Sequence, residues 1–262
     1  MKLLTLNCHS WQEENQLDKI NYLAKNIKEM QYDVIALQEV SQHKDSKIKY
    51  NTIKEDNYAE VLINELKKLN ETKYNYVWDF SHIGYDIYEE GLAILTKHPI
   101  VAFNSFYVSK DSTITNYKSR KIVSATIKIN NKDIDFYSCH LGWWHDETEP
   151  FKDQADMLIK HIDNNKLNFI MGDFNNNAFV KDEGYDYLIK NKFIDTYVIS
   201  KIKDNGITAI GKIDGWKTDS QDKRLDLILT NKDIQVNESK VVFNTEGTII
   251  SDHFGVVIDL DY

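Results

Sequence analysis

The chain has 262 residues, 42% of them hydrophobic, with 41 acidic and 32 basic side chains and a formal net charge of −9. This length suffices for one large domain or two small ones. Because no Pro/Gly/Ser-rich linker interrupts it, we expect a single domain over residues 1–262. Nucleic-acid-binding proteins usually neutralise phosphates with a basic face, so the acidic excess argues against nucleic acid as the partner.

No apolar run reaches the ~18 residues of a transmembrane helix, and no leader is evident before the first apolar strand. We therefore expect a cytoplasmic protein with no membrane partner.

The first part of the chain predicts a strand–helix–strand unit. Residues 2–6 are an apolar strand that ends at Asn7. Apolar residues then recur at three- and four-residue steps over residues 17–30, the spacing of an amphipathic helix. A second strand over residues 33–37 ends at Gln38-Glu39. Each strand of the unit thus carries polar side chains at its carboxyl end.

The next segments predict an exposed loop over residues 41–54, a helix over 58–69 and strands over 74–80 and 91–96. A hairpin follows. Residues 122–129 alternate between apolar and polar, Asn130-Asn131 is a typical tight turn, and the returning strand over 133–139 stops at His140.

The rest of the chain begins with a second strand–helix–strand unit, because a helix over 155–162 connects the strand ending at His140 to a strand over 167–171. Further elements are expected as a helix over 185–189 and strands over 225–229, 240–243 and 254–260. Strands interspersed with a few helices predict an α/β protein with two layers of sheet and helices outside, rather than a barrel.

Open α/β sheets build their active sites from polar side chains at the ends of strands. In this chain such side chains occur in four short segments, which we call polar strings. Here they are Asn7, Glu39, the Gly172-Asp173-Phe174-Asn175 string and the Ser251-Asp252-His253 string. Carboxylates, amides and a histidine that converge can hold a hard divalent cation and activate water. The set therefore indicates a metal-dependent hydrolase, although each string alone is equally typical of a surface turn.

Two of these strings suggest particular roles. Asp173 and Asn175, two apart at an extended strand end, can point to the same side, where a carboxylate and an amide could orient a water molecule. His253 needs a partner that fixes its tautomer. Its neighbour Asp252 faces the opposite way in an extended strand, so we expect Asp226 to be that partner.

The chain has only two arginines, Arg120 and Arg224, against thirty lysines, and both lie beside these elements. Arginine is favoured over lysine where a planar guanidinium must make two hydrogen bonds to a carboxylate or phosphate.

The two cysteines, Cys8 and Cys139, are expected to be buried and reduced rather than catalytic.

Taken in order, the strings resemble the endonuclease/exonuclease/phosphatase superfamily of metal-dependent phosphoesterases related to deoxyribonuclease I. The resemblance runs through nearly the whole chain and rests on these matching segments: Leu-Asn7, Leu-Gln-Glu39, residues 91–99, His140-Leu, Gly-Asp173-Phe-Asn175, Arg-Leu-Asp226 and Ser-Asp252-His253. It implies a four-layered α/β/β/α sandwich of two packed mixed sheets, with Mg²⁺ or Mn²⁺ as cofactor.

The resemblance also implies roles for these residues. Glu39 would be the principal metal ligand, assisted by Asn7 and Asp252. Asp173 would activate the attacking water, and Asn175 would position the phosphate. His140 and His253 would contact phosphoryl oxygens, and Asp226 would orient His253.

The substrate is expected to depend on segments around the strings. The Asn-x-His-Ser-Trp segment at residues 7–11 and the His-Leu-Gly-Trp-Trp segment at 140–144 are similar to bacterial maltose 6'-phosphate phosphatases. They suggest a small sugar phosphate bound by His9, Arg120, Trp143 and Trp144, since tryptophan rings can stack on sugars. The alternative is that both tryptophans pack a loop onto the core.

Two other functions remain as alternatives. One is a nuclease or other nucleic-acid phosphodiesterase, and the other is a sphingomyelinase-like lipid phosphodiesterase. A non-catalytic binding module is disfavoured because all the catalytic residue types are present.

Overall fold

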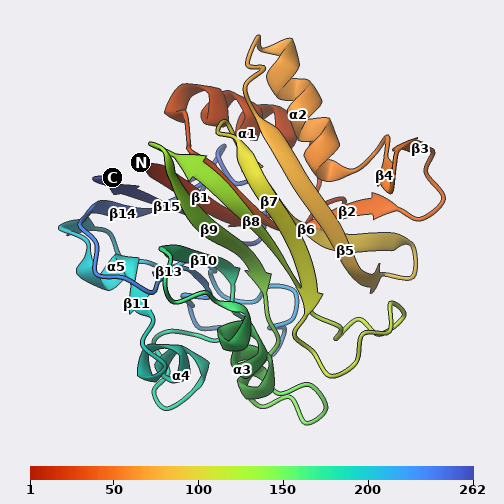
Figure 1. The fold of residues 1–262 in the computed structure, drawn as a ribbon. Coiled ribbons are helices and arrows are strands. Elements are labelled where there is room, and N and C mark those ends of the chain that lie inside the picture. The colour runs from red at the N-terminus through yellow and green to blue at the C-terminus, as the bar shows by residue number, and fades with distance from the viewer.

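The computed structural model describes residues 1–262, which fold into two packed β-sheets with helices on both outer faces (Figure 1). The first sheet has seven strands in the order β12 (Ile202–Lys203), β14 (Val236–Val242), β15 (Gly255–Leu260), β1 (Lys2–Asn7), β2 (Val34–His43), β6 (Tyr88–Thr96) and β5 (Asn75–Gly84). The second sheet has six strands in the order β11 (Ile194–Asp195), β13 (Asp226–Thr230), β10 (Asn168–Asp173), β9 (Lys132–His140), β8 (Lys121–Ile129) and β7 (Ile100–Tyr107).

Helices cover the outer face of each sheet. α1 (Gln16–Met30) and α2 (Tyr58–Lys68) lie on the first sheet, and α3 (Phe151–His161) and α4 (Gly184–Lys190) lie on the second (Figure 1). A short helix, α5 (Thr196–Ile199), lies beside β13 and β14. The expected four-layered α/β/β/α sandwich is confirmed.

Strand alternation distributes the apolar side chains among three layers of core. In β1, Leu4 packs under α1 and α2, whereas its neighbour Leu3 faces the second sheet. Likewise Ile170 of β10 packs under α3 and α4, whereas Phe169 faces the first sheet. Strands that are buried on both faces have continuous runs of apolar residues. Such runs can be recognised in the sequence.

Both expected strand–helix–strand units are present, and each pairs its two strands in parallel. In the first unit Asn7 lies beside Gln38, and in the second Asp173 lies beside His140. The Asn130-Asn131 turn also forms as expected, with positive φ at both residues, 50° and 61°.

One expectation about secondary structure is wrong, and β7, β11, β12 and α5 were not among the expected elements. Residues 41–54 are not an irregular loop, because β2 continues to His43 and a small hairpin of β3 (Ile48–Tyr50) and β4 (Ile53–Lys54) follows. β7 forms the edge of the second sheet. Its sequence is mostly apolar but does not alternate, and several of its residues are exposed, as is common in an edge strand with one paired side.

None of the helices is both long enough and apolar enough to cross a membrane.

Candidate active site

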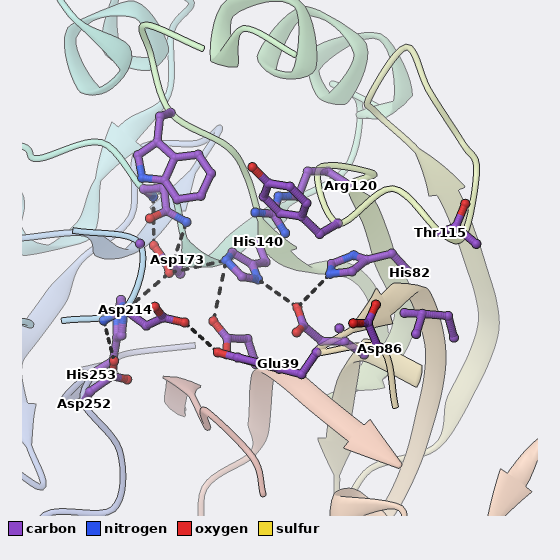
Figure 2. Close-up of a pocket in the computed structure, with 18 residues that line it drawn as sticks. Glu39, His82, Asp86, Thr115, Arg120, His140, Asp173, Asp214, Asp252 and His253 are labelled. Atoms are coloured by element: carbon purple, nitrogen blue, oxygen red, sulfur yellow. Dashed lines mark hydrogen bonds and ion pairs between the residues drawn. The ribbon is translucent and has the colours of Figure 1, made fainter. Parts of the chain in front are cut away.

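The predicted site residues meet at one edge of the two sheets, where strand ends from both sheets face each other. Figure 2 shows the side chains of Glu39, His140, Asp173, Asp252 and His253 gathered there. The parallel pairing of β1 with β2 and of β9 with β10 brings their carboxyl ends to this edge. β13 runs antiparallel to β10, so its first residue, Asp226, lies beside Asp173.

A bulge in β2 directs Glu39 into the site. Leu37 pairs with Ala93 and Val40 with Gly91, so two residues of β2 oppose one of β6, and Glu39 adopts a φ of 51°. The indole of Trp78, in β5 on the far side of β6, donates to the Val40 carbonyl at 2.8 Å and so helps to hold the bulge. A positive φ is unfavourable for glutamate, which indicates that the surroundings impose this conformation.

Asp173 is the centre of the polar cluster. The Asn7 side-chain amide donates to Asp173 Oδ2 at 3.1 Å and to Glu39 Oε1 at 2.8 Å, which ties the two sheets together. The Nε2 atoms of His140 and His253 each lie 3.7 Å from the same Asp173 oxygen. Gly172 precedes Asp173 with a φ of +149°, and a Cβ there would overlap the Cys139 carbonyl oxygen of β9. Only glycine therefore allows β10 to approach β9 so closely at this point.

The two histidines have opposite electrostatic surroundings. Asp226 Oδ2 lies 2.9 Å from Nδ1 of His253, as expected from the sequence. Burial alone would lower the pKa of His253, but the carboxylates of Asp226 and Asp173 outweigh it and raise the pKa well above its usual range. His140 has its pKa lowered well below the usual range by burial and by the Arg120 guanidinium. The surroundings thus favour the charged form of His253 and the neutral form of His140.

The donor set at Glu39 fits a hard divalent cation. Burial, with Glu90 and Asp252 nearby, raises the pKa of Glu39 to about 8. A cation bound by the Glu39 and Asp252 carboxylates would relieve this repulsion, and oxygen donors of this kind suit Mg²⁺ or Mn²⁺. The Asn7 amide presents its nitrogen to Glu39, and its oxygen accepts from the His9 backbone N–H at 3.1 Å, so Asn7 would have to turn its oxygen toward the cation to become a ligand. His9 lies at the rim of this group, with Nδ1 2.7 Å from Glu13 Oε1 and 3.6 Å from Asp252 Oδ1.

A cavity of about 410 Å³ opens onto this centre. Eight residues expected from the sequence line it: Glu39, Arg120, His140, Trp143, Asp173, Asn175, Asp252 and His253. Arg120 is buried, its Nε has no hydrogen-bond partner, and its guanidinium carbon lies 5.8 Å from the Trp143 ring centroid.

The other lining residues were not expected. They are His82, Ile83, Gly84, Tyr85, Asp86 and Glu90 around the β5–β6 turn, Thr115 and Tyr117 after β7, and Asp214 and Gly215 before β13. The Tyr85 hydroxyl donates to Asp214 Oδ2 at 2.5 Å and so connects segments 129 residues apart. The acidic and aromatic composition of the β5–β6 turn was the one sequence signal that could have indicated part of this wall.

Some expected residues do not line the cavity. Asn7 and Asp226 lie behind it and bond to residues that do. Trp144 packs against Phe151 of α3 and Tyr187 of α4, with ring centroids 6.1 and 5.8 Å away. The expectation that Trp144 stacks on substrate is therefore wrong for this structure, because its ring fills the layer between the second sheet and its helices.

The other arginine also has a structural role. The Arg224 guanidinium makes two hydrogen bonds to the buried Asp195 carboxylate, at 2.7 and 2.8 Å, and lies over the Tyr197 ring. Arg224 thus binds a carboxylate, as expected for an arginine, but this carboxylate is a side chain of the protein and not part of a substrate. Cys8 and Cys139 are buried and unpaired, as expected.

The sandwich and this polar cluster are those of a phosphoester hydrolase, and the cluster has acidic and histidine side chains that could hold a metal ion. The Endonuclease/Exonuclease/phosphatase family profile matches residues 4–253, so the chain belongs to this family. A solved endonuclease/exonuclease/phosphatase family protein from Leptotrichia buccalis is 43% identical over the full length of both chains, with a TM-score of 0.94.

More distant structures share the fold. The mannosyl-6-phosphatase of Bacteroides thetaiotaomicron is 16% identical over the full length of both chains, with a TM-score of 0.72. The beta toxin of Staphylococcus aureus is 17% identical over the full length of both chains, with a TM-score of 0.66. No curated protein sequence matches the chain.

Proposed function

We propose that this protein is a phosphomonoesterase that removes phosphate from a small sugar phosphate, such as maltose 6'-phosphate, with Mg²⁺ or Mn²⁺ as cofactor. The observation that carries the proposal is the composition of the cavity wall. The rings of Tyr85, Tyr117 and Trp143 lie near the carboxylates of Asp86 and Asp214 in one cavity. Aromatic faces pack on sugar rings, carboxylates accept hydrogen bonds from hydroxyls, and the volume suits a small ligand.

In this proposal Glu39, Asn7 and Asp252 would hold the cation, which would supply positive charge that neutralises the phosphate and favours attack by water. Asp173 accepts the proton of the attacking water, and Asn175 positions the phosphate by donating from its amide. The low pKa of His140 and the high pKa of His253 leave one neutral and one charged donor for the phosphoryl oxygens. Asp226 keeps the His253 ring in its orientation. Arg120 has unused donors for phosphate or sugar oxygens.

The charge of the cavity disfavours the nuclease alternative. Six acidic residues line the cavity, no lysine does, and Arg120 is its one arginine. A polynucleotide would need several basic contacts along its backbone. The lipid phosphodiesterase alternative has equally little support, because the β5–β6 hairpin ends in a short turn of three residues, 85–87, and the Tyr85 hydroxyl bonds to Asp214 at the cavity wall.

A hydrolysis screen with Mg²⁺ and with Mn²⁺ tests the proposal. It would follow inorganic phosphate from the monoesters, shortened strands from oligonucleotides and phosphocholine from sphingomyelin. The substrates would be maltose 6'-phosphate, hexose 6-phosphates, nucleotides, oligonucleotides and sphingomyelin. We expect the highest kcat/KM on a sugar phosphate and no measurable cleavage of oligonucleotides. Preferential cleavage of an oligonucleotide or of sphingomyelin would replace the proposal with one of the alternatives.

A further inference from the structure

Trp216, which was not among the expected site residues, makes a direct hydrogen bond to the reaction centre. Its indole nitrogen donates to Asn175 Oδ1 at 2.9 Å. Trp216 belongs to the segment of residues 211–219 before β13, which we call the wall loop. The same loop contributes Asp214 and Gly215 to the cavity. The bond therefore connects the cavity wall to a residue on the cavity floor.

The surroundings of Asn175 leave its amide little freedom. Its backbone φ is 48°, and its backbone N–H donates to Asp173 Oδ1 at 2.8 Å. The side-chain nitrogen donates to the Leu141 carbonyl at 3.0 Å and lies 3.5 Å from Asp173 Oδ2. An indole N–H can only donate, so Trp216 fixes the oxygen end of the amide on its own side and directs the NH₂ end toward Asp173.

The wall loop is held in turn by a buried lysine. The Lys223 ammonium is fully buried and donates to the carbonyls of Gly211, Asp219 and Gln221 at 2.9, 3.2 and 2.5 Å. It also lies 5.5 Å from the Trp216 ring centroid. An ammonium with three carbonyl partners is well satisfied, and the Trp216 ring packs on a small apolar cluster of Ala209, Ile213 and Leu225. Trp216 is thus anchored independently of Asn175.

We infer that Trp216 is a positioning residue, which holds the Asn175 amide so that one N–H donates to the Leu141 carbonyl and the other, beside Asp173, is directed at the phosphate. The inference rests on the phosphate-binding role proposed for Asn175. Trp216 itself does not contact the reacting atoms. If the indole N–H is lost, only the contacts of the NH₂ group with Leu141 and Asp173 restrain the amide. The oxygen end then moves more, and the amide donor is less often aligned with the phosphate. The effect should appear mainly in kcat, because the cavity wall that binds the leaving group stays in place.

Trp216→Phe keeps an aromatic ring on the Ala209 cluster and under Lys223 but removes the N–H. We expect kcat to fall about 10-fold, the scale of one lost hydrogen bond, with KM changed by less than about 2-fold. Trp144→Phe is the matched control, because that ring is also half-buried but makes no hydrogen bond to the site; its kcat should stay within about 2-fold of wild type.

A double-mutant cycle separates positioning from simple packing. If Trp216 acts through Asn175, Trp216→Phe should have no further effect on kcat in the Asn175→Ala background. An equal loss of kcat in both backgrounds, or no loss in wild type, would overturn the inference.

A spectroscopic measurement on the metal-free protein tests the bond even if the substrate proposal fails. The five tryptophans give five indole N–H signals in a ¹H–¹⁵N spectrum, and Trp216→Phe assigns one of them by its disappearance. Asn175→Ala should shift that signal while leaving the signal of Trp144 in place. If the Trp216 signal does not move, the hydrogen bond is absent in solution and the inference is wrong, whatever the enzyme hydrolyses.

Discussion

Trp143 and Trp144 are adjacent in sequence but have different surroundings. Trp143 lines the cavity beside Arg120, and the backbone of Gly215 lies so close that a Cβ there would be 2.9 Å from the Trp143 ring. Trp144 lies on the other side of the segment, among side chains of α3 and α4. A sequence pattern cannot assign the two rings to these places, because an irregular segment has no periodicity that separates its faces.

Replacing each tryptophan by alanine should therefore have different consequences. Trp143→Ala should raise KM for a disaccharide phosphate far more than for p-nitrophenyl phosphate, because only the sugar would use the ring. Trp144→Ala should leave both KM values unchanged and lower the free energy of unfolding by about 2 to 3 kcal/mol through lost packing. Steady-state kinetics and chemical denaturation measure the two effects. Equal changes in KM for both substrates in Trp143→Ala would contradict sugar stacking.

At the scale of elements, Asp33 joins three segments at the start of β2. Its carboxylate accepts from the Lys2 backbone N–H at 2.8 Å, and its other oxygen lies 2.7 Å from His98 Nε2 and 3.2 Å from Lys97 Nζ. Burial alone would raise the pKa of Asp33, but these partners outweigh it and lower the pKa below its usual 3.8. The charged carboxylate therefore stabilises the contact between β1, β2 and the turn after β6.

Asp33→Asn should reduce the free energy of unfolding at pH 7 by about 1 to 2 kcal/mol. Because the pKa is lower in the folded state, this stabilisation is complete above the unfolded-state pKa of about 3.8 and is lost as the pH falls through the folded-state value. Urea denaturation at several pH values should show wild type and variant converging below pH 3.8. A difference that stays constant into that acidic range would show that the carboxylate charge is not the cause.

The sequence predicted those elements whose apolar pattern is regular, and the site residues at their ends. β1, β2, β9 and β10 were recognisable as apolar strands, so Asn7, Glu39, His140 and Asp173 could be placed at one edge. The bulge that turns Glu39 into the site depends on pairing with β6, which is a tertiary contact. The hairpin at residues 48–54 and β7 were missed because their exposed residues carry no clear alternation.

At the scale of the whole molecule, the cavity is assembled from segments far apart in the chain. Its floor comes from strand ends of both sheets, and its wall comes from the β5–β6 turn, the segment after β7 and the wall loop. Contacts such as Tyr85 with Asp214 and Trp216 with Asn175 depend on how the two sheets pack. Family motifs therefore indicated the phosphoester chemistry, and Arg120 and Trp143 were expected from the sequence, whereas the rest of the wall became visible only in three dimensions.

The most direct test of the central claim is metal-dependent phosphate release by wild type and Glu39→Gln, with folding checked by circular dichroism. Wild type should release phosphate from a sugar phosphate with Mg²⁺ or Mn²⁺ and stop when the metal is chelated. Glu39→Gln should fold normally and lose at least about 100-fold in kcat/KM, the scale of removing one charge-stabilising group. Full activity in Glu39→Gln, or release that continues without metal, would contradict the assignment of this cluster as a metal-dependent phosphoesterase site.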